Sequence, residues 1–213
     1  MGGIDVSIVS SGHDVADARL HRATAALRRA GLSVEVVALG RADDAPAGCV
    51  VRVRPRKGRL DRLKMALEAP WRARGRVLVT LDPDSALGAY ARRALVGGDR
   101  LRLVADVHED YAALLADRPW ARGVAGRAAS WLAKAGAWAA GRADLTVVAD
   151  SHLAPDAPRR LVVRNLPDLS LLPVGGAGTP DPRPRALYIG DIRASRGLFQ
   201  MLDAVKAAPA WRL

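Results

Sequence analysis

Short apolar runs rich in β-branched residues alternate with longer amphipathic segments along most of the chain. The apolar runs predict strands at residues 4–10, 33–39, 49–54, 76–80, 101–107, 145–149 and 161–164. The segments between them predict helices at about residues 15–30, inside the stretch 56–76, at about 86–95, and along a segment through Trp131 and Trp138. Such alternation is typical of a mostly parallel α/β sheet. We therefore expect a Rossmann-like fold.

For several helices the sequence also predicts which face is buried or where the helix ends. Leu20, Thr24 and Leu27 recur at helical spacing and predict the buried face of the first helix. Pro70 is expected to end the helix inside the basic stretch 56–76. Another stripe has nearly helical period, which favours core packing over membrane insertion; it consists of Trp120, Val124, Trp131, Ala135 and Trp138.

The composition changes abruptly at residues 167–184, whose letters PDLSLLPVGGAGTPDPRP are typical of a linker. The α/β rhythm then resumes with a strand at 186–190 and a helix at about 195–208. This helix is expected to bury Leu198, Met201, Leu202 and Val205. One strand and one helix cannot bury a core alone. The sequence therefore predicts an acceptor-side domain over 1–166, a linker, and an incomplete second Rossmann-like domain over 185–213.

Polar residues follow the strands at the edge where an open parallel sheet binds its ligands, beyond the strand carboxyl ends. Five such clusters occur, at residues 10–14, 81–84, 108–110, 150–152 and 165–167. Three of the four histidines fall in them: His13, His108 and His152. We expect the clusters to line one rim of the sheet and to face a cleft.

These clusters also carry a resemblance to the family 4 glycosyltransferases of GT-B fold. The opening SSGHDVADARLHRATAALRRAGLSVEVVA resembles the family's first strand, turn and helix, with motif positions occupied by His13, Asp17, Arg19 and Gly31. LDPDSALGAYARRAL, LVADVHEDY, VVRNLPD and LYIGDIRASRGLFQML resemble later family segments in the same order. The resemblance covers nearly the whole chain. No single motif is very specific, but five in register are.

The resemblance implies a function and a set of site residues. It implies transfer of a hexose, with retention, from a nucleotide diphosphate sugar to a hydroxyl acceptor on a glycan, a glycolipid or a lipid-linked molecule, without a metal or other cofactor. His108 matches the histidine that lies beside the transferred sugar in the family, so it is the catalytic candidate, with a positioning or polarising role. The acceptor-binding candidates are Gly12, His13, Asp17, Arg19 and Glu109.

Each candidate also has a purely structural interpretation. Gly12 can serve a tight turn in which Asp14 is the N-cap of the following helix. His108 can cap the next helix, and Glu109 and Asp110 can be acids that favour its N-terminus. These alternatives stay open at the level of the sequence.

The remaining carboxylates of the rim favour structural roles. Asp82 and Asp84 flank a proline, and an Asx-capped turn is favoured over a metal site. Asp106 is expected to point to the opposite face from Val107 and to order the loop that follows. No cluster of ligands requires a metal.

The donor side of the resemblance lies after the linker. Gly190 and Gly197 bracket DIRASR, and Arg193 and Arg196 are the cations expected to bind the donor diphosphate. Asp191 departs from the family, which usually has arginine there, and a solvated helix start is the alternative. The family's paired glutamates belong to a later loop, so we expect the chain to be inactive alone unless a separate C-terminal half supplies them. The alternative function is a truncated or split remnant that binds an acceptor or a partner chain without catalysis.

The formal charge of +11 favours anionic partners, although coding bias toward arginine gives the same excess. Scattered arginines and 4% aromatic residues argue against nucleic acid. The basic stretch 56–76 carries Leu60, Leu63, Met65 and Leu67, which suits either an anionic membrane surface or a plain surface helix.

The termini and the single cysteine, Cys49, bear on location. The opening residues do not resemble a signal peptide. The most apolar stretch, 120–138, is interrupted by Arg122, Arg127 and Lys134, so it is not expected to cross a membrane. One cysteine cannot form an intramolecular disulfide. We therefore expect a cytoplasmic protein, peripheral at most at the inner face of the membrane.

Overall fold

The computed structural model describes residues 3–55, 58–116, 123–164, 166, 185–190, 192 and 197–211. The chain divides into two compact units, Met1–Asn165 and Leu166–Leu213. The expected linker at residues 167–184 lies outside the described residues.

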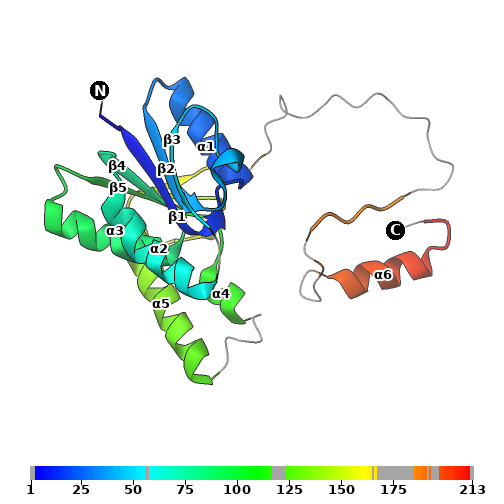
Figure 1. The fold of residues 1–213 in the computed structure, drawn as a ribbon. Helices are drawn as coiled ribbons and strands as arrows, with labels where there is room; N and C mark the ends of the chain where they lie inside the picture. Colours follow the sequence, from blue (N-terminus) through cyan, green and yellow to red (C-terminus); the bar gives the residue numbers. More distant parts are fainter. Residues whose placement is uncertain are drawn as a thin grey trace. The chain divides into compact units, whose positions relative to one another are not determined.

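The first unit is built on a parallel sheet of seven strands (Figure 1). The strands are β1 Val6–Asp14, β2 Val34–Leu39, β3 Val50–Arg54, β4 Val77–Thr80, β5 Arg102–Val107, β6 Leu145–Val148 and β7 Arg160–Val162. Their order in the sheet is β3-β2-β1-β4-β5-β6-β7, and every neighbouring pair is parallel. The predicted Rossmann-like fold is confirmed.

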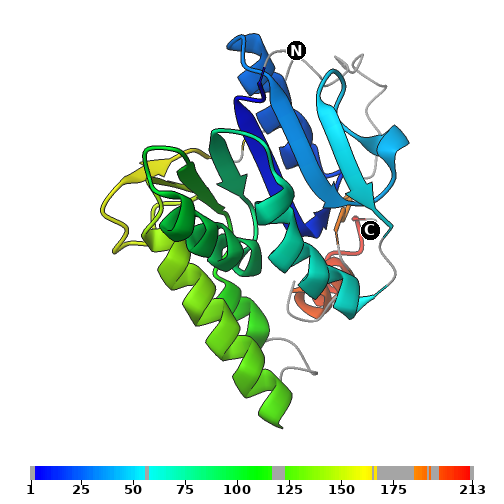
Figure 2. The ribbon, with the colours of Figure 1, turned by 60° about the vertical axis from the view of Figure 1, so that its left-hand side comes forward.

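Helices cover both faces of this sheet (Figure 2). They are α1 Ala18–Arg29, α2 Arg59–Arg72, α3 Pro83–Val96, α4 Tyr111–Ala116 and α5 Gly123–Gly141, with a short 3-10 turn, η1, at Ala42–Asp44. α1 packs on one face, where Leu20 and Thr24 are buried as expected and Leu27 packs against the same core. α2, α3 and α5 pack on the other face, around Leu78 and Leu103.

The chain reverses its direction of winding between β1 and β4. β2 and β3 lie on one side of β1, and β4 to β7 lie on the other side. At such a switch point the loops that leave adjacent strands diverge to opposite faces, which opens a crevice beyond the strand carboxyl ends. The crevice therefore lies between the tip of β1 and the turn from β4 into α3.

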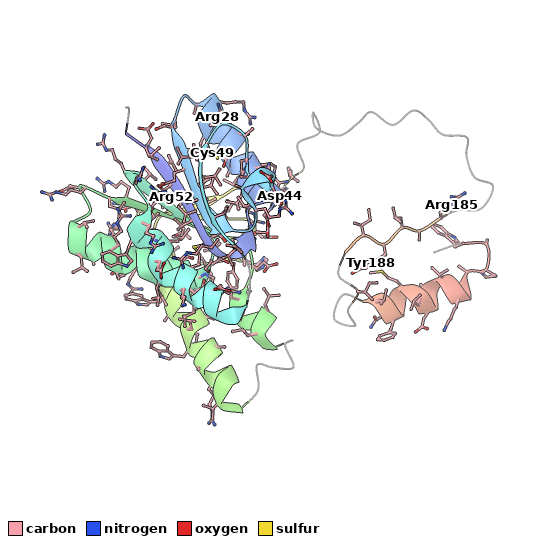
Figure 3. The ribbon with its side chains drawn as sticks, viewed as in Figure 1. Arg28, Asp44, Cys49, Arg52, Arg185 and Tyr188 are labelled. Carbon is pink, nitrogen blue, oxygen red and sulfur yellow. The ribbon has the colours of Figure 1, made fainter. Side chains whose placement is uncertain are left out.

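A buried carboxylate joins the first three strands. Glu35 on β2 is fully buried and accepts a hydrogen bond of 2.7 Å from the Ser7 hydroxyl on β1 and one of 2.9 Å from the Arg74 main-chain N–H. Arg52 on β3 places its Nε 3.0 Å from the other carboxylate oxygen (Figure 3). A buried charge is tolerated only with such partners, so Glu35 fixes the register of β1 to β3.

Pro70 does not end α2, which continues to Arg72, so the expected helix end is wrong. The proline lies in the last turn, where its missing N–H removes only one helical hydrogen bond. Arg92 on α3 donates to the carbonyls of Pro70 and Ala73, with 2.8 Å to Ala73, and these bonds stabilise the helix end.

The aromatic stripe of α5 is exposed, so the prediction that it packs in the core is wrong. Val124, Trp131 and Trp138 keep 77%, 71% and 47% of their surface accessible, and Trp120 lies outside the described residues. α5 instead turns small residues inward, and the buried ones are Gly126, Ala133, Gly136, Ala139 and Ala140. Small residues allow the helix to approach α3 closely, which larger side chains would prevent.

The second unit contains one described helix, α6 Leu198–Ala207. Residues 186–190 do not form the expected strand, because the described part of this unit offers no neighbouring strand beyond an isolated bridge at Arg185. The expected buried face of α6 is not buried either, and Met201 and Leu202 remain 37% and 38% exposed. Without a sheet to pack on, the apolar face of the helix stays accessible.

Cys49 lies just before β3, and its Sγ is 3.1 Å from the Pro46 carbonyl oxygen.

Among the described residues, no helix combines the length and the apolar character needed to cross a bilayer.

The packing of α5 on α3 gives a first prediction. A Cβ added to Gly136 would lie 2.5 Å from the Cβ of Pro83, so Gly136→Ala should push the helices apart and cost about 1–3 kcal/mol of unfolding free energy. Gly141, in the same helix, has nothing within 4 Å of such a Cβ. Gly141→Ala should therefore be neutral or stabilise by up to about 1 kcal/mol. Urea unfolding measures both, and equal effects of the two substitutions would contradict this packing.

Candidate functional site

The tip of β1, at Ser10, Ser11 and Gly12, is held mainly by the carboxylate of Asp82, in the turn before α3. Asp82 is 5% exposed, and its Oδ2 accepts hydrogen bonds from the Ser10 hydroxyl at 2.6 Å and from the main-chain N–H groups of Ser11 at 2.9 Å and Gly12 at 3.1 Å. Asp82 makes no side-chain cap to α3, so its interpretation as an Asx cap is wrong. The carboxylate instead joins β1 to β4, and β1 extends to Asp14 instead of ending at residue 10.

Asp84 extends this contact toward α2. Its Oδ1 accepts a hydrogen bond of 2.6 Å from the Ser11 hydroxyl, and its Oδ2 accepts one of 3.0 Å from Arg62 Nε. Both carboxylates of the turn are thus occupied by donors from the protein. Among the described residues, no group of three or more possible ligands could hold a metal ion.

His13 lies near the end of β1, directly after Gly12, and each of its two ring nitrogens contacts a neighbouring side chain. Its Nδ1 lies 2.9 Å from Asp17 Oδ2, and its Nε2 lies 3.0 Å from Nε2 of His108, which follows β5. Asp17 is the N-cap of α1, because its Oδ1 accepts from the Arg19 main-chain N–H at 2.8 Å. The interpretation of Asp14 as this N-cap is wrong. The side chain of Asp14 accepts a hydrogen bond from the N–H of Ala16, which lies before the helix begins.

Tyr111 closes the cluster from α4. Its hydroxyl donates to the Leu81 carbonyl at 3.1 Å and lies 3.5 Å from His108 Nε2. Burial, reinforced by the charge of Asp82, raises the pKa of Tyr111 well above its ordinary value. The start of α4 is capped by Asp110, whose Oδ1 accepts from the Ala113 N–H at 3.1 Å, and not by His108.

The two histidines have opposite pKa shifts. Burial lowers the pKa of His108 to about 3, and the positive charges of Arg19 and His13 add to this effect. Burial also acts to lower the pKa of His13, but the hydrogen bond to Asp17 and the charge of Asp82 outweigh it and raise the pKa. The hydrogen bond to His13 in turn lowers the pKa of Asp17 to about 2.

Asp106 lies on the same side of the sheet as Arg19. Burial raises its pKa, although the charges of Arg19 and His13 act in the opposite direction. Val107 packs against the core on the other face, as the alternation along β5 predicts.

A cavity of about 690 Å³ opens beside this cluster. Its polar floor contains Gly12, His13, Arg62, Asp82 and Asp84. Its apolar wall comes from α2, α4 and α5 and contains Leu63, Leu114, Leu115, Ala129 and Leu132. A cavity with an apolar wall and a few convergent polar groups is the usual form of a small-molecule site.

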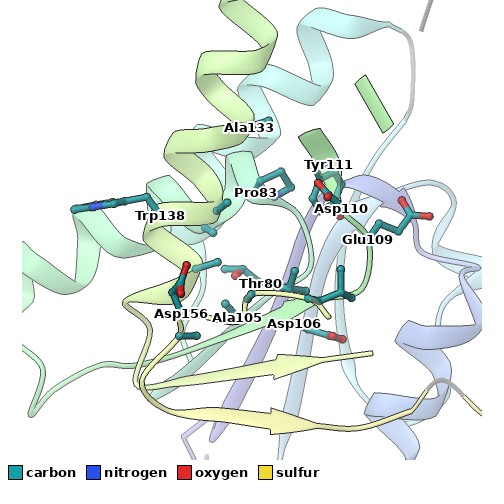
Figure 4. Close-up of a pocket in the computed structure, with 18 of the residues that line it drawn as sticks. Thr80, Pro83, Ala105, Asp106, Glu109, Asp110, Tyr111, Ala133, Trp138 and Asp156 are labelled. Atoms are coloured by element: carbon teal, nitrogen blue, oxygen red, sulfur yellow. The ribbon is translucent and has the colours of Figure 1, made fainter. Parts of the chain in front are cut away.

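A second cavity, of about 760 Å³, lies on the α5 side of the same edge (Figure 4). It shares Asp82, Pro83 and Tyr111 with the first cavity and is bordered by residues 152–158. Thr80 lines it with a buried hydroxyl that has no hydrogen-bond partner among the described residues. His152 belongs to this second cavity and not to the cluster around His13 and His108.

The structure brings most of the acceptor-side candidates together. Gly12, His13, Asp17 and His108 meet at the switch point, and Arg19 acts on them through its main-chain N–H and its charge. Glu109 is exposed and lines both cavities. His108 lies behind His13 and is not among the lining residues.

The donor-side candidates belong to the second unit. Gly190 and Gly197 both have positive φ angles, 157° and 75°, and Gly197 precedes α6 as its N-cap. Arg193 and Arg196 lie outside the described residues.

Sequence reasoning missed two members of the site, Arg62 and Tyr111. Both lie on helices: Arg62 reaches the rim because α2 packs beside β1, and Tyr111 because α4 begins four residues after β5. The polar residues after the strands could not reveal them, although Tyr111 directly follows the cluster at 108–110.

The contact between Gly12 and Asp82 gives a second prediction. A Cβ on Gly12 would lie 2.5 Å from Asp82 Oδ1, so Gly12→Ala should displace the carboxylate, shift the amide NMR signals of Ser11 and His13, and cost about 1–3 kcal/mol of stability. Gly3 has nothing within 4 Å of such an atom, so Gly3→Ala is the matched control. Unchanged signals in Gly12→Ala would show that the contact is not made in solution.

Comparison of the sequence with models of known protein families gives no match, and comparison with curated proteins gives none either.

Proposed function

We propose that the first unit is the acceptor-side domain of a retaining hexosyltransferase. In this proposal a hexose passes from a nucleotide diphosphate sugar to a hydroxyl of a glycan, a glycolipid or a lipid-linked acceptor. The motif resemblance supports it, and one structural observation carries it further. Gly12, His13 and His108 come from strands far apart in the sequence and meet at the switch point, beside a cavity.

The floor of the cavity suits a ligand that carries hydroxyl groups. Arg62 offers N–H donors, and Asp84 and Glu109 offer acceptor oxygens. A hydroxyl both donates and accepts, so it can pair with either kind of group. The leucine wall suits an apolar portion of the same acceptor, which favours a glycolipid or lipid-linked molecule over a free glycan.

His108 is the proposed positioning or polarising group for the reacting hydroxyl. Its low pKa keeps the ring uncharged at neutral pH, so one ring nitrogen can accept a hydrogen bond. His13 covers Nε2 of His108 in this structure, so a reacting hydroxyl would take the place of that contact.

The donor phosphates are proposed to bind between Gly190 and Gly197, with Arg193 and Arg196 as cations. Positive φ at both glycines leaves the backbone free to approach an anion. A remnant that binds its acceptor without transfer is the alternative.

Attachment to an anionic membrane is a further part of the proposal. On α2, Leu63, Leu67 and Trp71 form an exposed stripe with 49%, 59% and 48% of their surface accessible. Lys64 and Arg72 lie on the same helix. An exposed apolar stripe with flanking cations is typical of helices that lie in the membrane interface.

Acceptor binding is tested with octyl β-glucoside below its micelle concentration, followed by NMR. We expect signals of Gly12, His13 and Tyr111 to shift, and His108→Ala to weaken binding about tenfold, the loss expected for one hydrogen bond. His21→Ala, on α1 and away from the cluster, is the control. Addition of UDP-glucose or GDP-mannose then tests donor binding and transfer. Binding of neither class would refute the proposal, and acceptor binding without donor binding would favour the remnant.

Membrane attachment is tested by co-sedimentation with phosphatidylcholine vesicles, with and without phosphatidylglycerol. Each buried large apolar side chain contributes about 1.5–3 kcal/mol, so the double substitution Leu67→Ser and Trp71→Ser should reduce binding to anionic vesicles by at least about 100-fold. Leu95→Ser removes a still more exposed leucine from α3, 76% accessible, and should have no effect. Equal binding to neutral vesicles would contradict a role for the cations.

A further inference from the structure

The three side chains Asp17, His13 and His108 form a continuous row of hydrogen-bonding atoms. His13 is the middle member, with Nδ1 2.9 Å from Asp17 Oδ2 and Nε2 3.0 Å from His108 Nε2. The two rings meet edge to face, with centroids 4.9 Å apart and planes at 61°. Asp17 cannot turn away freely, because its other oxygen caps α1 through the Arg19 N–H.

The number of hydrogens that the ring nitrogens can carry limits the positive charge of this row. Asp17 is ionised at neutral pH and can only accept, so Nδ1 of His13 carries a hydrogen. At 3.0 Å, one Nε2 must carry a hydrogen and the other must be bare. Two charged rings would place hydrogens on both Nε2 atoms and break the contact. The two histidines can therefore hold only one positive charge while the row is intact.

The surroundings decide which ring takes that charge. Carboxylates lie close to His13, since Asp17 binds its Nδ1 and Asp82 Oδ1 lies 3.8 Å from its Nε2. His108 instead faces the cation of Arg19, which disfavours a positive charge on its ring. The ionisable groups of the neighbouring elements are Asp17 before α1, Arg19 of α1, Arg62 of α2, Asp82 before α3, Asp84 of α3, Asp106 of β5, Glu109, and Tyr111 of α4.

We infer that His13 and His108 act as one unit that takes up a single proton, and that Asp17 is a positioning residue that directs this proton to His13 and not to His108.

For catalysis this inference rests on the proposed function. The neutral His108 ring accepts from His13 at Nε2 while the row is intact, and it can accept from an acceptor hydroxyl once that hydroxyl displaces the contact. The proton on His13 places a positive charge beside the cavity floor, where it stabilises negative charge that develops on an oxygen bound there. Asp17, which does not line the cavity, would act on the reaction only through His13.

The test is an NMR titration of the ring nitrogens in the whole chain, without any sugar. The chain has four histidines, so single substitutions to glutamine assign their signals. We expect His13 to titrate above the ordinary histidine value and to keep a hydrogen on Nδ1 throughout. His108 should stay neutral until the pH falls to about 3.

Two substitutions at Asp17 separate positioning from folding. Asp17→Asn and Asp17→Ser both retain an oxygen that can cap α1. Both remove the charge at His13, and the serine is also too short to reach the ring. In both variants the His13 midpoint should move to lower pH. Asp14→Asn removes a neighbouring carboxylate that does not touch His13 and should leave the midpoint unchanged.

The inference is overturned if His108 titrates near neutral pH, or if either Asp17 variant folds and leaves the His13 midpoint in place. Failure of the proposed function has a different signature, because it would abolish sugar binding and leave these titrations unaltered.

Discussion

The candidate site depends on the carboxylate of Asp82. Its Oδ2 accepts three hydrogen bonds from the tip of β1, and it lies in the turn where β4 enters α3. A buried carboxylate oxygen that accepts three hydrogen bonds is strongly fixed, because loss of any donor would leave part of its negative charge without a partner. This contact spans the switch point of the sheet, where the two halves of the winding separate. Together with the hydrogen bond from the Ser11 hydroxyl to Asp84, it holds the tip of β1 beside the start of α3.

The other features of the site follow from this contact. Because Ser10, Ser11 and Gly12 are held against Asp82, the next residue along β1, His13, is directed toward β5 and meets His108. Gly12 is required in this arrangement for steric reasons, since any Cβ would meet the carboxylate. Close packing of α5 on α3 at Gly136 supports the turn from behind, through Pro83. Thus the close contacts at Gly12 and Gly136 and the carboxylate of Asp82 set the geometry of the histidine pair.

The sequence was sufficient for the fold of the first unit, because β-branched runs and helical periods recur at the spacing of a parallel sheet. It was insufficient wherever a choice between faces or partners is made by tertiary contacts. Polar residues 10–14 are predicted as a turn, yet pairing of Asp14 with Leu39 of β2 extends β1 through them. Asp14 and Asp17 are both suitable N-caps, and only the position of the helix start selects Asp17. On α5, period alone cannot show that close helix packing selects alanine and glycine for the inner face and leaves Trp131 outside.

The charges of the rim also narrow the kind of ligand that the first unit would take. The chain carries a formal charge of +11, yet the cluster at the switch point is balanced. Asp82 and Asp84 face Arg62, and Asp17 faces His13, so each cation near the floor already has a carboxylate partner. An anion would have to compete with these carboxylates, whereas a neutral hydroxyl can pair with their remaining lone pairs. The balance therefore favours a neutral, hydroxyl-bearing acceptor in this unit and leaves the recognition of phosphates to other parts of the protein.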